Sequence, residues 1–269
     1  MALSREKGKL VARLLNPRQR SRAGAFIVEG IRGAREALAG PRLPAIRLAL
    51  VASGLQGTEA GRQLFERMKD SGISMEEISD RELAGLSDTE HPQGVLLVVE
   101  EPRDGLEVLE GEATPRVLIL DGVQDPGNAG TLIRSAHAFG LHGVLALDGS
   151  VDPFNPKVIR ASAGAWAHLP VLRVSWSDAS AWLRRRELPV LVADPVGDDI
   201  RDVRRPPGWA LVVGNEGAGP RQDVVEAATR VVGIPIEKGV GSLNAGLAGA
   251  ILLFALSSCP REGGGGEGN

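Results

Sequence analysis

The chain contains one cysteine and no tyrosine, and aromatic residues make up only 3% of its 269 residues. A single cysteine, Cys259, excludes an internal disulfide and a cysteine-based metal cluster. No stretch approaches the roughly 18 consecutive apolar residues of a membrane-spanning helix, and residues 1–7 contain no apolar signal-peptide core. With 43% hydrophobic residues, the chain has enough apolar material for a core. These features favour a cytoplasmic protein that binds no membrane.

Charge is distributed unevenly along the chain, although the net charge is only −3. Residues 1–50 contain eleven Lys or Arg and three Glu, a balance of +8, whereas the remaining 20 basic and 31 acidic residues give −11. A basic segment on an acidic body suits a partner rich in phosphate, such as RNA. A solvated helix face is the alternative explanation.

Alternating strand and helix patterns in the first hundred residues predict a small α/β domain over residues 1–103. Residues 104–115 are polar, contain Gly and Pro and show no periodicity, so a linker is expected there. The patterns predict strands at residues 26–30, 46–52, 73–78 and 95–100, and helices at residues 4–16, 31–39, 61–71 and 81–86.

A second domain is predicted over residues 116–260, followed by a glycine-rich, disordered tail at 261–269. Strand–helix alternation of this kind indicates a parallel sheet covered on both faces. The predicted strands are 117–121, 143–147, 169–174, 190–193, 210–214 and 231–235, and the predicted helices end at 139 or span 156–163, 178–186, 221–228 and 243–257.

The last predicted helix is apolar on nearly every face and should therefore be buried all round. Ser242 is expected to cap its N-terminus. Each of Gly246 and Gly249 lowers helix propensity by about 1 kcal/mol. Such glycines are explained if another part of the backbone passes very close to the helix.

Three glycine-rich loops follow predicted strands, at the sheet edge where parallel α/β proteins bind ligands. Their sequences match neither a dinucleotide fingerprint, since the glycine spacing after Gly214 is wrong, nor a phosphate loop, since Gly-Lys-Ser/Thr is absent. The loops are Asp125-Pro-Gly-Asn-Ala-Gly130, Gly214-Asn-Glu-Gly-Ala-Gly-Pro220 and Gly239-Val-Gly-Ser-Leu-Asn244.

These three loops, in this order, resemble motifs 1, 2 and 3 of the SPOUT superfamily, in its SpoU/TrmH-type RNA 2′-O-ribose methyltransferases. The resemblance runs from about residue 117 to 257 and includes Ile159-Arg-Ala-Ser-Ala-Gly164. Phe26-Ile-Val-Glu-Gly30 and His91-Pro-Gln-Gly-Val95 also resemble the small substrate-binding domain that precedes the catalytic domain in many members.

The resemblance implies a deep trefoil knot at the C-terminus, a homodimer and S-adenosylmethionine held in the knot. Knots are almost absent from other proteins, so the sequence pattern alone does not suggest one. The family binds this cofactor largely through backbone groups of motifs 2 and 3, which correspond to Gly214, Ile234 and Leu243. No metal is required.

The resemblance also implies roles for five polar residues. Asn128 is expected beside the reacting ribose, although a helix N-cap would explain it too. Arg134 is expected to clamp substrate phosphate and stabilise the developing alkoxide, because a guanidinium keeps its proton; a role as the base stays open. Glu216 is expected to orient Arg134 or the substrate. Ser242 and Asn244 are expected to act with these residues, and Asn244 to contact the cofactor carboxylate, the ribose or the other site residues.

Ribosomal RNA is favoured as substrate over transfer RNA, because the N-terminal domain is the commoner accessory of the ribosomal members. A non-catalytic RNA-binding or ribosome-assembly protein is the alternative from another class, and a base methyltransferase is disfavoured by the Ser-Leu-Asn motif. An antibiotic-resistance role stays open. The residues expected to contact RNA are Arg13, Arg18, Arg20, Arg22 and Arg160.

Overall fold

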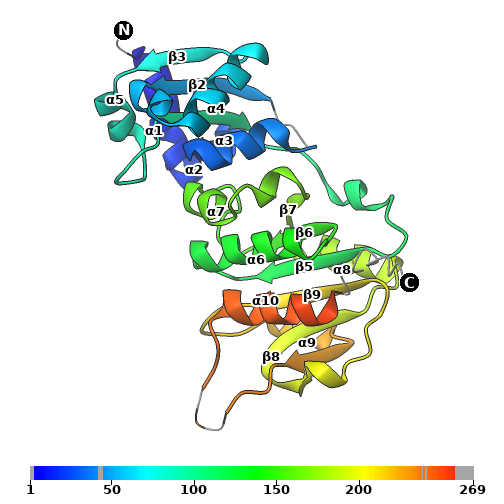
Figure 1. Ribbon diagram of the computed structural model, residues 1–269. Coiled ribbons are helices and arrows are strands. Elements are labelled where there is room, and N and C mark those ends of the chain that lie inside the picture. Colours follow the sequence, from blue (N-terminus) through cyan, green and yellow to red (C-terminus); the bar gives the residue numbers. More distant parts are fainter. Residues whose placement is uncertain (1–2, 42–44, 238, 240, 258–269) are drawn as a thin grey trace, which may run out of the picture.

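The computed structural model describes residues 3–41, 45–237, 239 and 241–257, which form two sheets surrounded by helices (Figure 1). Cys259 and the tail predicted at residues 261–269 lie outside the described residues. None of the helices in the described ranges is long and apolar enough to cross a membrane.

The N-terminal sheet has the strand order β1-β4-β2-β3, in which β4 is antiparallel to both neighbours and β3 runs parallel to β2. The central strand β4 is a run of Val and Leu buried on both faces, as its composition predicts. The four strands are β1 (Ala25–Glu29), β2 (Ile46–Ala52), β3 (Met75–Ile78) and β4 (Val95–Glu100).

Helices cover both faces of this sheet. Val11 and Leu14 of the first helix pack on one face, and Leu64 and Met68 of α4 belong to the core on the other. Asn16 both ends the first helix and caps a second, which the sequence patterns had not predicted. The helices are α1 (Arg5–Leu15), α2 (Pro17–Ala23), α3 (Gly30–Ala39), η1 (Ser53–Gly57), α4 (Glu59–Asp70) and α5 (Asp80–Leu86).

The C-terminal sheet has six strands in the order β10-β8-β9-β5-β6-β7, and every neighbouring pair is parallel, as predicted. β5, β6 and β7 lie side by side in chain order. On the other side of β5 lies β9, followed by β8 and then β10 at the far edge. These strands are β5 (Arg116–Asp121), β6 (Gly143–Leu147), β7 (Val171–Val174), β8 (Val190–Asp199), β9 (Trp209–Gly214) and β10 (Arg230–Gly233).

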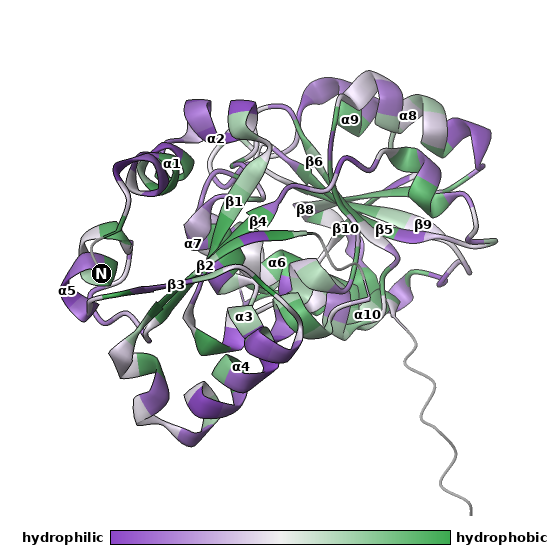
Figure 2. Ribbon diagram, turned by 90° about the horizontal axis from the view of Figure 1, so that it is seen from above, coloured by the Kyte–Doolittle hydropathy of each residue, from purple (hydrophilic) through white to green (hydrophobic). Residues whose placement is uncertain are grey.

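Side chains alternate between two buried layers along these strands. Leu118 and Leu120 belong to one core with α6, whereas Val117 and Ile119 belong to the other with α8. Figure 2 shows the resulting apolar centre and the hydrophilic outer surfaces of α4 and α8. The helices of this part are α6 (Pro126–Ala138), α7 (Pro156–Ala161), η3 (Ala165–Ala167), α8 (Trp176–Arg185), η4 (Ile200–Asp202), α9 (Gln222–Glu226) and α10 (Ala245–Leu256).

The segment expected to be a linker, residues 104–115, is more ordered than its composition predicts. It contains a short helical turn, η2 (Leu106–Leu109), and Leu109 is only 1% exposed within the second core of the C-terminal part. One well-buried leucine is enough to anchor this segment, because it packs against the neighbouring sheet and helix.

The two parts of the chain share one continuous core. Phe26 of β1 lies with its ring centroid 5.0 Å from those of both Phe154 and Trp166 of the C-terminal part. Gly40 allows the backbones to come together, because a Cβ there would lie 2.4 Å from the Ala167 carbonyl oxygen, and Gly164 leaves room for the Glu36 side chain, which a Cβ would meet at 2.2 Å. The relative position of the two parts is therefore set by packing, not by the connecting segment alone.

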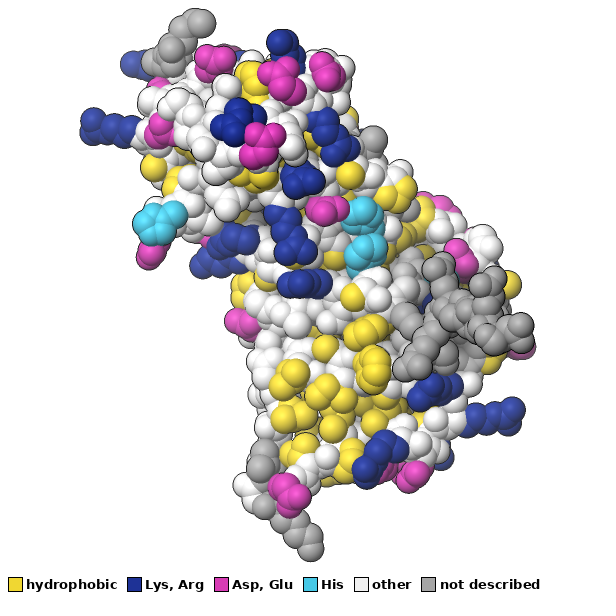
Figure 3. Space-filling model, viewed as in Figure 1, with side chains coloured by type: hydrophobic (Ala, Val, Ile, Leu, Met, Phe, Trp, Pro, Cys, Tyr) yellow, Lys and Arg dark blue, Asp and Glu magenta, His cyan; other side chains and the backbone are white. Residues whose placement is uncertain are grey.

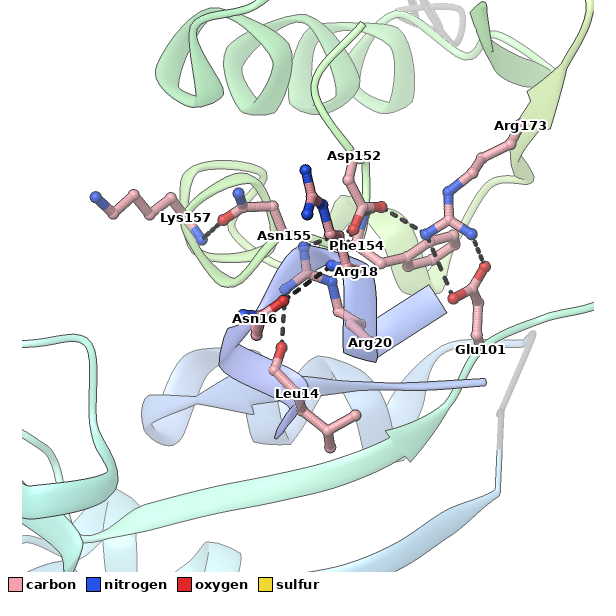
Figure 4. A network of polar contacts seen from close by, with 10 residues as sticks. All are labelled: Leu14, Asn16, Arg18, Arg20, Glu101, Asp152, Phe154, Asn155, Lys157 and Arg173. Carbon is pink, nitrogen blue, oxygen red and sulfur yellow. Dashed lines mark hydrogen bonds and ion pairs between the residues drawn. The ribbon is translucent and has the colours of Figure 1, made fainter. Parts of the chain in front are cut away.

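Arg20 also joins the two parts and corrects the expectation that it contacts RNA. Its side chain is fully buried, and Nε and Nη2 lie 2.7 and 2.6 Å from Oδ2 of Asp152, while Nη1 donates to the Leu14 carbonyl (Figure 4). Arg173 pairs with both Asp152 and Glu101. Burial by itself would raise the pKa of Asp152, but the two arginines outweigh it and lower that pKa.

The final helix, α10, differs from its predicted surroundings. Leu252, Leu253 and Leu256 are buried, whereas Leu247 is 50% exposed and Phe254 is 68% exposed, so within a single chain α10 is buried on one side and the predicted burial all round would need a second subunit on the other. The exposed side chains belong to an apolar patch over α10, which is visible in Figure 3.

We expect Arg20→Met to lower the free energy of unfolding by about 3 kcal/mol near pH 7, because it leaves the ionised, largely buried Asp152 without one of its partners. Arg18→Met is the matched control, since Arg18 is exposed and its side chain makes no contact with Asp152. The control should change stability by less than about 0.5 kcal/mol. Urea denaturation measures both, and equal effects would contradict the structural role of Arg20.

Candidate active site

The three glycine-rich loops meet at the carboxyl ends of the parallel strands, as predicted. The second and third loops line a cavity of about 410 Å³ between the ends of β8, β9 and β10 and the start of α10. The first loop does not line it, but contacts the second loop through hydrogen bonds to Glu216. Gly214, Ile234 and Leu243, the three residues expected to bind cofactor, all line this cavity, and Ser242 lines it as well. Its size is within the range of small-molecule sites in proteins.

Another segment lines the same cavity and was missed by the sequence reasoning. Residues Ala193, Asp194 and Pro195 lie where β8 leaves its paired region, between β9 and β10. The sequence did indicate this position, because the predicted strand at 190–193 ends directly before Asp194 and ligands bind at such strand ends. Only the strand order shows that this end lies beside the other loops.

The loop after β9 is held in place by hydrogen bonds to the end of β5. Asn215 donates from Nδ2 to the Gly122 carbonyl at 2.8 Å, and its Oδ1 accepts from two amides of its own loop. The buried carboxylate of Asp121 accepts from both the amide and Nε of Arg221, each at 2.7 Å. These contacts fix the loop wall of the cavity.

Asn128, Glu216 and Asn244 form one hydrogen-bonded group, although they come from three separate loops. Nδ2 of Asn128 donates to Oε1 of Glu216 at 3.0 Å. Oδ1 of Asn128 accepts from the side-chain Nδ2 of Asn244 at 2.8 Å. Asn128 is only 7% exposed. The structure therefore brings three of the five predicted catalytic residues together.

The carboxylate of Glu216 is held ionised by this group. Partial burial opposes ionisation, but hydrogen bonds from the Asn128 side chain and from the backbone amides of Gln124 and Asp125 outweigh it and lower the pKa of Glu216. Its oxygens thus hold the start of α6. One of the two roles expected of Glu216 was to orient Arg134. Among the described residues, however, Glu216 makes no contact with Arg134.

Two helix caps differ from the predictions. Asp125, not Asn128, caps α6 by accepting from the Asn128 amide at 2.7 Å, which frees the Asn128 side chain for Glu216 and Asn244. Asn244, not Ser242, caps α10 by accepting from the Leu247 amide. An Asn cap still has its side-chain NH₂ to donate elsewhere, which explains the contact with Asn128.

Gly246 explains how Asn244 reaches Asn128. A Cβ on Gly246 would lie 3.2 Å from the Asn128 Cα, and a Cβ on Gly249 would lie 2.2 Å from Leu132 Cδ2. The expectation that backbone passes close to the small residues of this helix is confirmed at Gly246. At Gly249 the close neighbours are side chains of α6 and β9.

The arginines predicted to act on RNA are dispersed. Arg134 is exposed and lines a different cavity, at the junction of the two parts. Arg160 lines that cavity too, and its 39% exposed side chain pairs with Glu29 and Asp88 at 3.6 and 3.4 Å. Arg13, Arg18 and Arg22 are exposed, and Arg20 is the buried arginine described above.

Two histidines from different segments are neighbours at the junction of the two parts. The rings of His137 and His168 stack with centroids 4.8 Å apart, and His168 lies 2.7 Å from a carboxylate oxygen of Glu36. Burial and the adjacent His168 lower the pKa of His137. The pair lies between α6 and α3 and contributes to the junction of the two parts.

Comparison with known proteins matches both parts of the chain. Residues 115–254 match the model of the SpoU rRNA Methylase family, and residues 6–97 match the MRM3-like substrate binding domain.

Full-length relatives are also similar to this chain. It is 32% identical to the 23S rRNA (guanosine(2553)-2′-O)-methyltransferase RlmP of Bacillus subtilis, over 93% of this chain and 96% of the relative. It is 31% identical to a 23S rRNA (uridine(2479)-2′-O)-methyltransferase of Streptomyces viridochromogenes, over 90% and 86%. The crystal structure of the SpoU methyltransferase AviRb from that organism, in complex with AdoMet, superposes with a TM-score of 0.83 at 27% identity, covering 93% of this chain and 97% of AviRb.

We expect Asn128→Asp to lower stability most at high pH. The introduced carboxylate would face Glu216 at about the present 3.0 Å. Two carboxylates this close share one proton, and the pKa for losing that proton is raised above the pKa of the same groups in the unfolded chain. Because a raised folded-state pKa restores stability as pH falls through it, the deficit relative to the natural protein should shrink between about pH 8 and pH 5.

Asn155→Asp is the control, because Asn155 caps α7 through the Lys157 amide and aspartate caps a helix equally well. Its stability difference should stay nearly constant over the same pH range. Chemical denaturation at several pH values gives both curves, and a pH-independent deficit for Asn128→Asp would contradict the direct contact with Glu216.

Proposed function

The chain belongs to the SpoU rRNA methylase family, and from this we propose that it methylates a ribose 2′-hydroxyl in RNA with S-adenosylmethionine as methyl donor. Ribosomal RNA is the favoured substrate, as for the relatives from Bacillus subtilis and Streptomyces viridochromogenes. The observation that carries the proposal is the hydrogen-bonded group of Asn128, Glu216 and Asn244, of which Glu216 also lines the cavity.

The cavity suits S-adenosylmethionine in size and in lining. Gly214 forms part of its wall, and a Cβ there would lie 2.3 Å from the Pro220 backbone nitrogen, so the loop keeps its shape only with glycine. Gly214, Ile234 and Leu243 would hold the cofactor, with Ala193, Asp194 and Pro195 on the adjoining side. When bound, the cofactor supplies a methyl group on a sulfonium, which is a good leaving group.

The protein groups around this cavity are suited to positioning the ribose. Glu216 holds Asn128 through one carboxylate oxygen and the start of α6 through both, so the Asn128 amide has a fixed orientation. Asn244 fixes the other side of Asn128. We assign Asn128 to the ribose hydroxyls and Glu216 and Asn244 to its orientation, with Ser242 at the cavity wall. Such preorganisation accelerates a displacement by holding the reacting atoms in line.

Arg134 is assigned to the RNA phosphate. A guanidinium keeps its proton, so Arg134 is suited to stabilising negative charge on the substrate. It is exposed and lies on the same helix as Asn128, six residues further along. A phosphate next to the reacting ribose is within reach of that position.

Three further features follow from the family and are proposed for this chain. The C-terminal segment through α10 forms the trefoil knot, two chains associate through the apolar patch over α10, and residues 1–103 bind RNA while residues 116–260 carry out the reaction. Exposure of Leu247 and Phe254 supports the dimer. An enzyme of this kind works in the cytoplasm, where unmodified ribosomal RNA is available.

Transfer of labelled methyl from S-adenosylmethionine to RNA tests the function. RNA from cells lacking this protein is the substrate, and ribosomal and transfer RNA are separated before digestion. Label recovered as a 2′-O-methyl nucleoside from ribosomal RNA is the expected result. Label on transfer RNA would change the substrate, label on a base would change the reaction, and cofactor binding without any transfer would favour a non-catalytic RNA-binding protein.

Arg134→Ala should reduce methyl transfer at least a hundredfold and leave the Kd for S-adenosylmethionine nearly unchanged, because Arg134 does not line the cofactor cavity. Isothermal calorimetry and single-turnover assays give the two quantities. Arg184→Ala, on the far side of the sheet in α8, is a control for loss of one positive charge. Equal loss of cofactor binding and turnover in Arg134→Ala would count against a phosphate clamp.

Phe254→Glu should convert the dimer to a monomer, because it places a charge in the centre of an apolar interface. Val196→Glu is the control, since Val196 is 91% exposed outside α10. Sedimentation velocity at micromolar concentration distinguishes the two states. A natural protein that sediments as a monomer at that concentration would refute the proposed dimer.

A further inference from the structure

A second cavity of about 430 Å³ lies at the junction of the two parts, separate from the proposed cofactor cavity. One wall is the turn from β1 into α3 together with the segment before β4, and the other wall comes from α6, α7 and the residues after α7. Three stretches noted for their family resemblance therefore contribute to one cavity: residues 26–30, 91–95 and 159–164.

The rim of this cavity is positively charged. Arg32 and Arg134 come from opposite walls, and among the described residues neither guanidinium has an ion pair or a side-chain hydrogen bond. The third arginine, Arg160, is neutralised by Glu29 and Asp88 across the junction. Figure 3 shows Lys and Arg side chains gathered at the height of α3, α6 and α7. Two unpaired arginines facing one cavity are suited to a phosphate diester.

The interior of the cavity is suited to a base. Its lining includes the partly exposed side chains of Pro92, Ala161 and Ala163, which offer apolar contact surface above the buried Val28, Leu96 and Ile159. Gln93 also lines it, and its Oε1 accepts from the Ile31 amide at 3.0 Å. That contact fixes the Gln93 side chain and leaves its NH₂ group as a donor for a base edge. An apolar interior with one oriented polar group and cationic rim residues is the usual composition of a specific ligand site.

We propose that this cavity binds one unpaired nucleotide of the RNA substrate, next in the strand to the methylated one. Arg32 and Arg134 hold its phosphate, and Gln93 contacts the edge of its base. This inference rests on the proposed RNA methyltransferase function and assigns part of its substrate recognition to the junction.

The geometry of α6 connects the two sites. Asn128 lies in the first turn of α6 and Arg134 six residues later, a rise of about 9 Å along the axis. A strand whose ribose lies at Asn128 can therefore place a neighbouring nucleotide at Arg134. Proteins that recognise RNA sequence commonly insert unstacked bases into such pockets, and the rigid junction of the two parts supplies a preformed one.

The test measures binding of an unmethylated 23S rRNA transcript at several salt concentrations. Arg32→Ala should raise the Kd about fivefold and reduce the slope of log K against log salt by about one, because one phosphate contact is lost. Gln93→Ala should weaken binding with little change in that slope. Arg184→Ala is the control for charge, and calorimetry with S-adenosylmethionine shows whether each variant keeps its cofactor site.

The inference would be overturned if Arg32→Ala bound the rRNA transcript as tightly as Arg184→Ala does. It would also be overturned if Arg32→Ala weakened binding of a mononucleotide but not of the rRNA transcript. The proposed function fails differently, through absence of methyl transfer by the natural protein. Methyl transfer with unchanged rRNA binding in Arg32→Ala would thus refute the junction site and leave the enzyme assignment intact.

Discussion

The close approach of α10 to α6 is the constraint on which the site depends. Glycine at position 246 lets the start of α10 come near the Asn128 backbone, and Asn244 then reaches the Asn128 side chain at 2.8 Å. A Cβ at position 246 would lie 3.1 Å from Oδ1 of Asn128, tighter than an ordinary contact, so it would press on the residue that also holds Glu216. Three loops far apart in the chain are thereby coupled, and the cavity beside them takes its shape from the same contact.

α6 connects this site to the rest of the molecule. Its first turn contributes Asn128, and Arg134 lies further along at the junction with the N-terminal part. The junction itself is held by a shared apolar core and by the buried pair of Arg20 and Asp152. A fixed junction matters for RNA recognition, because the distance between the reacting ribose and its neighbours is then set by the protein.

The basic N-terminal segment has more than one function in this arrangement. Arg20 contributes to packing between the parts, whereas Arg13, Arg18 and Arg22 remain exposed. A positive balance counted along the sequence overstates the charge available to RNA, since buried arginines are neutralised by their partners. Arg32, which was not among the residues expected to contact RNA, is better placed at the junction than Arg20.

The sequence by itself determined the strand and helix pattern, the parallel C-terminal sheet and the three loops of the site, because periodicity and glycine-rich strand ends are local properties. It also determined the family, through the order of those loops. Only the tertiary structure decided that Asn244 caps α10 while Asn128 pairs with Glu216, that Arg20 is buried, and that residues at the end of β8 line the cavity proposed for the cofactor. These features depend on which segments become neighbours, and strand order and helix packing are set by contacts between residues far apart in the chain.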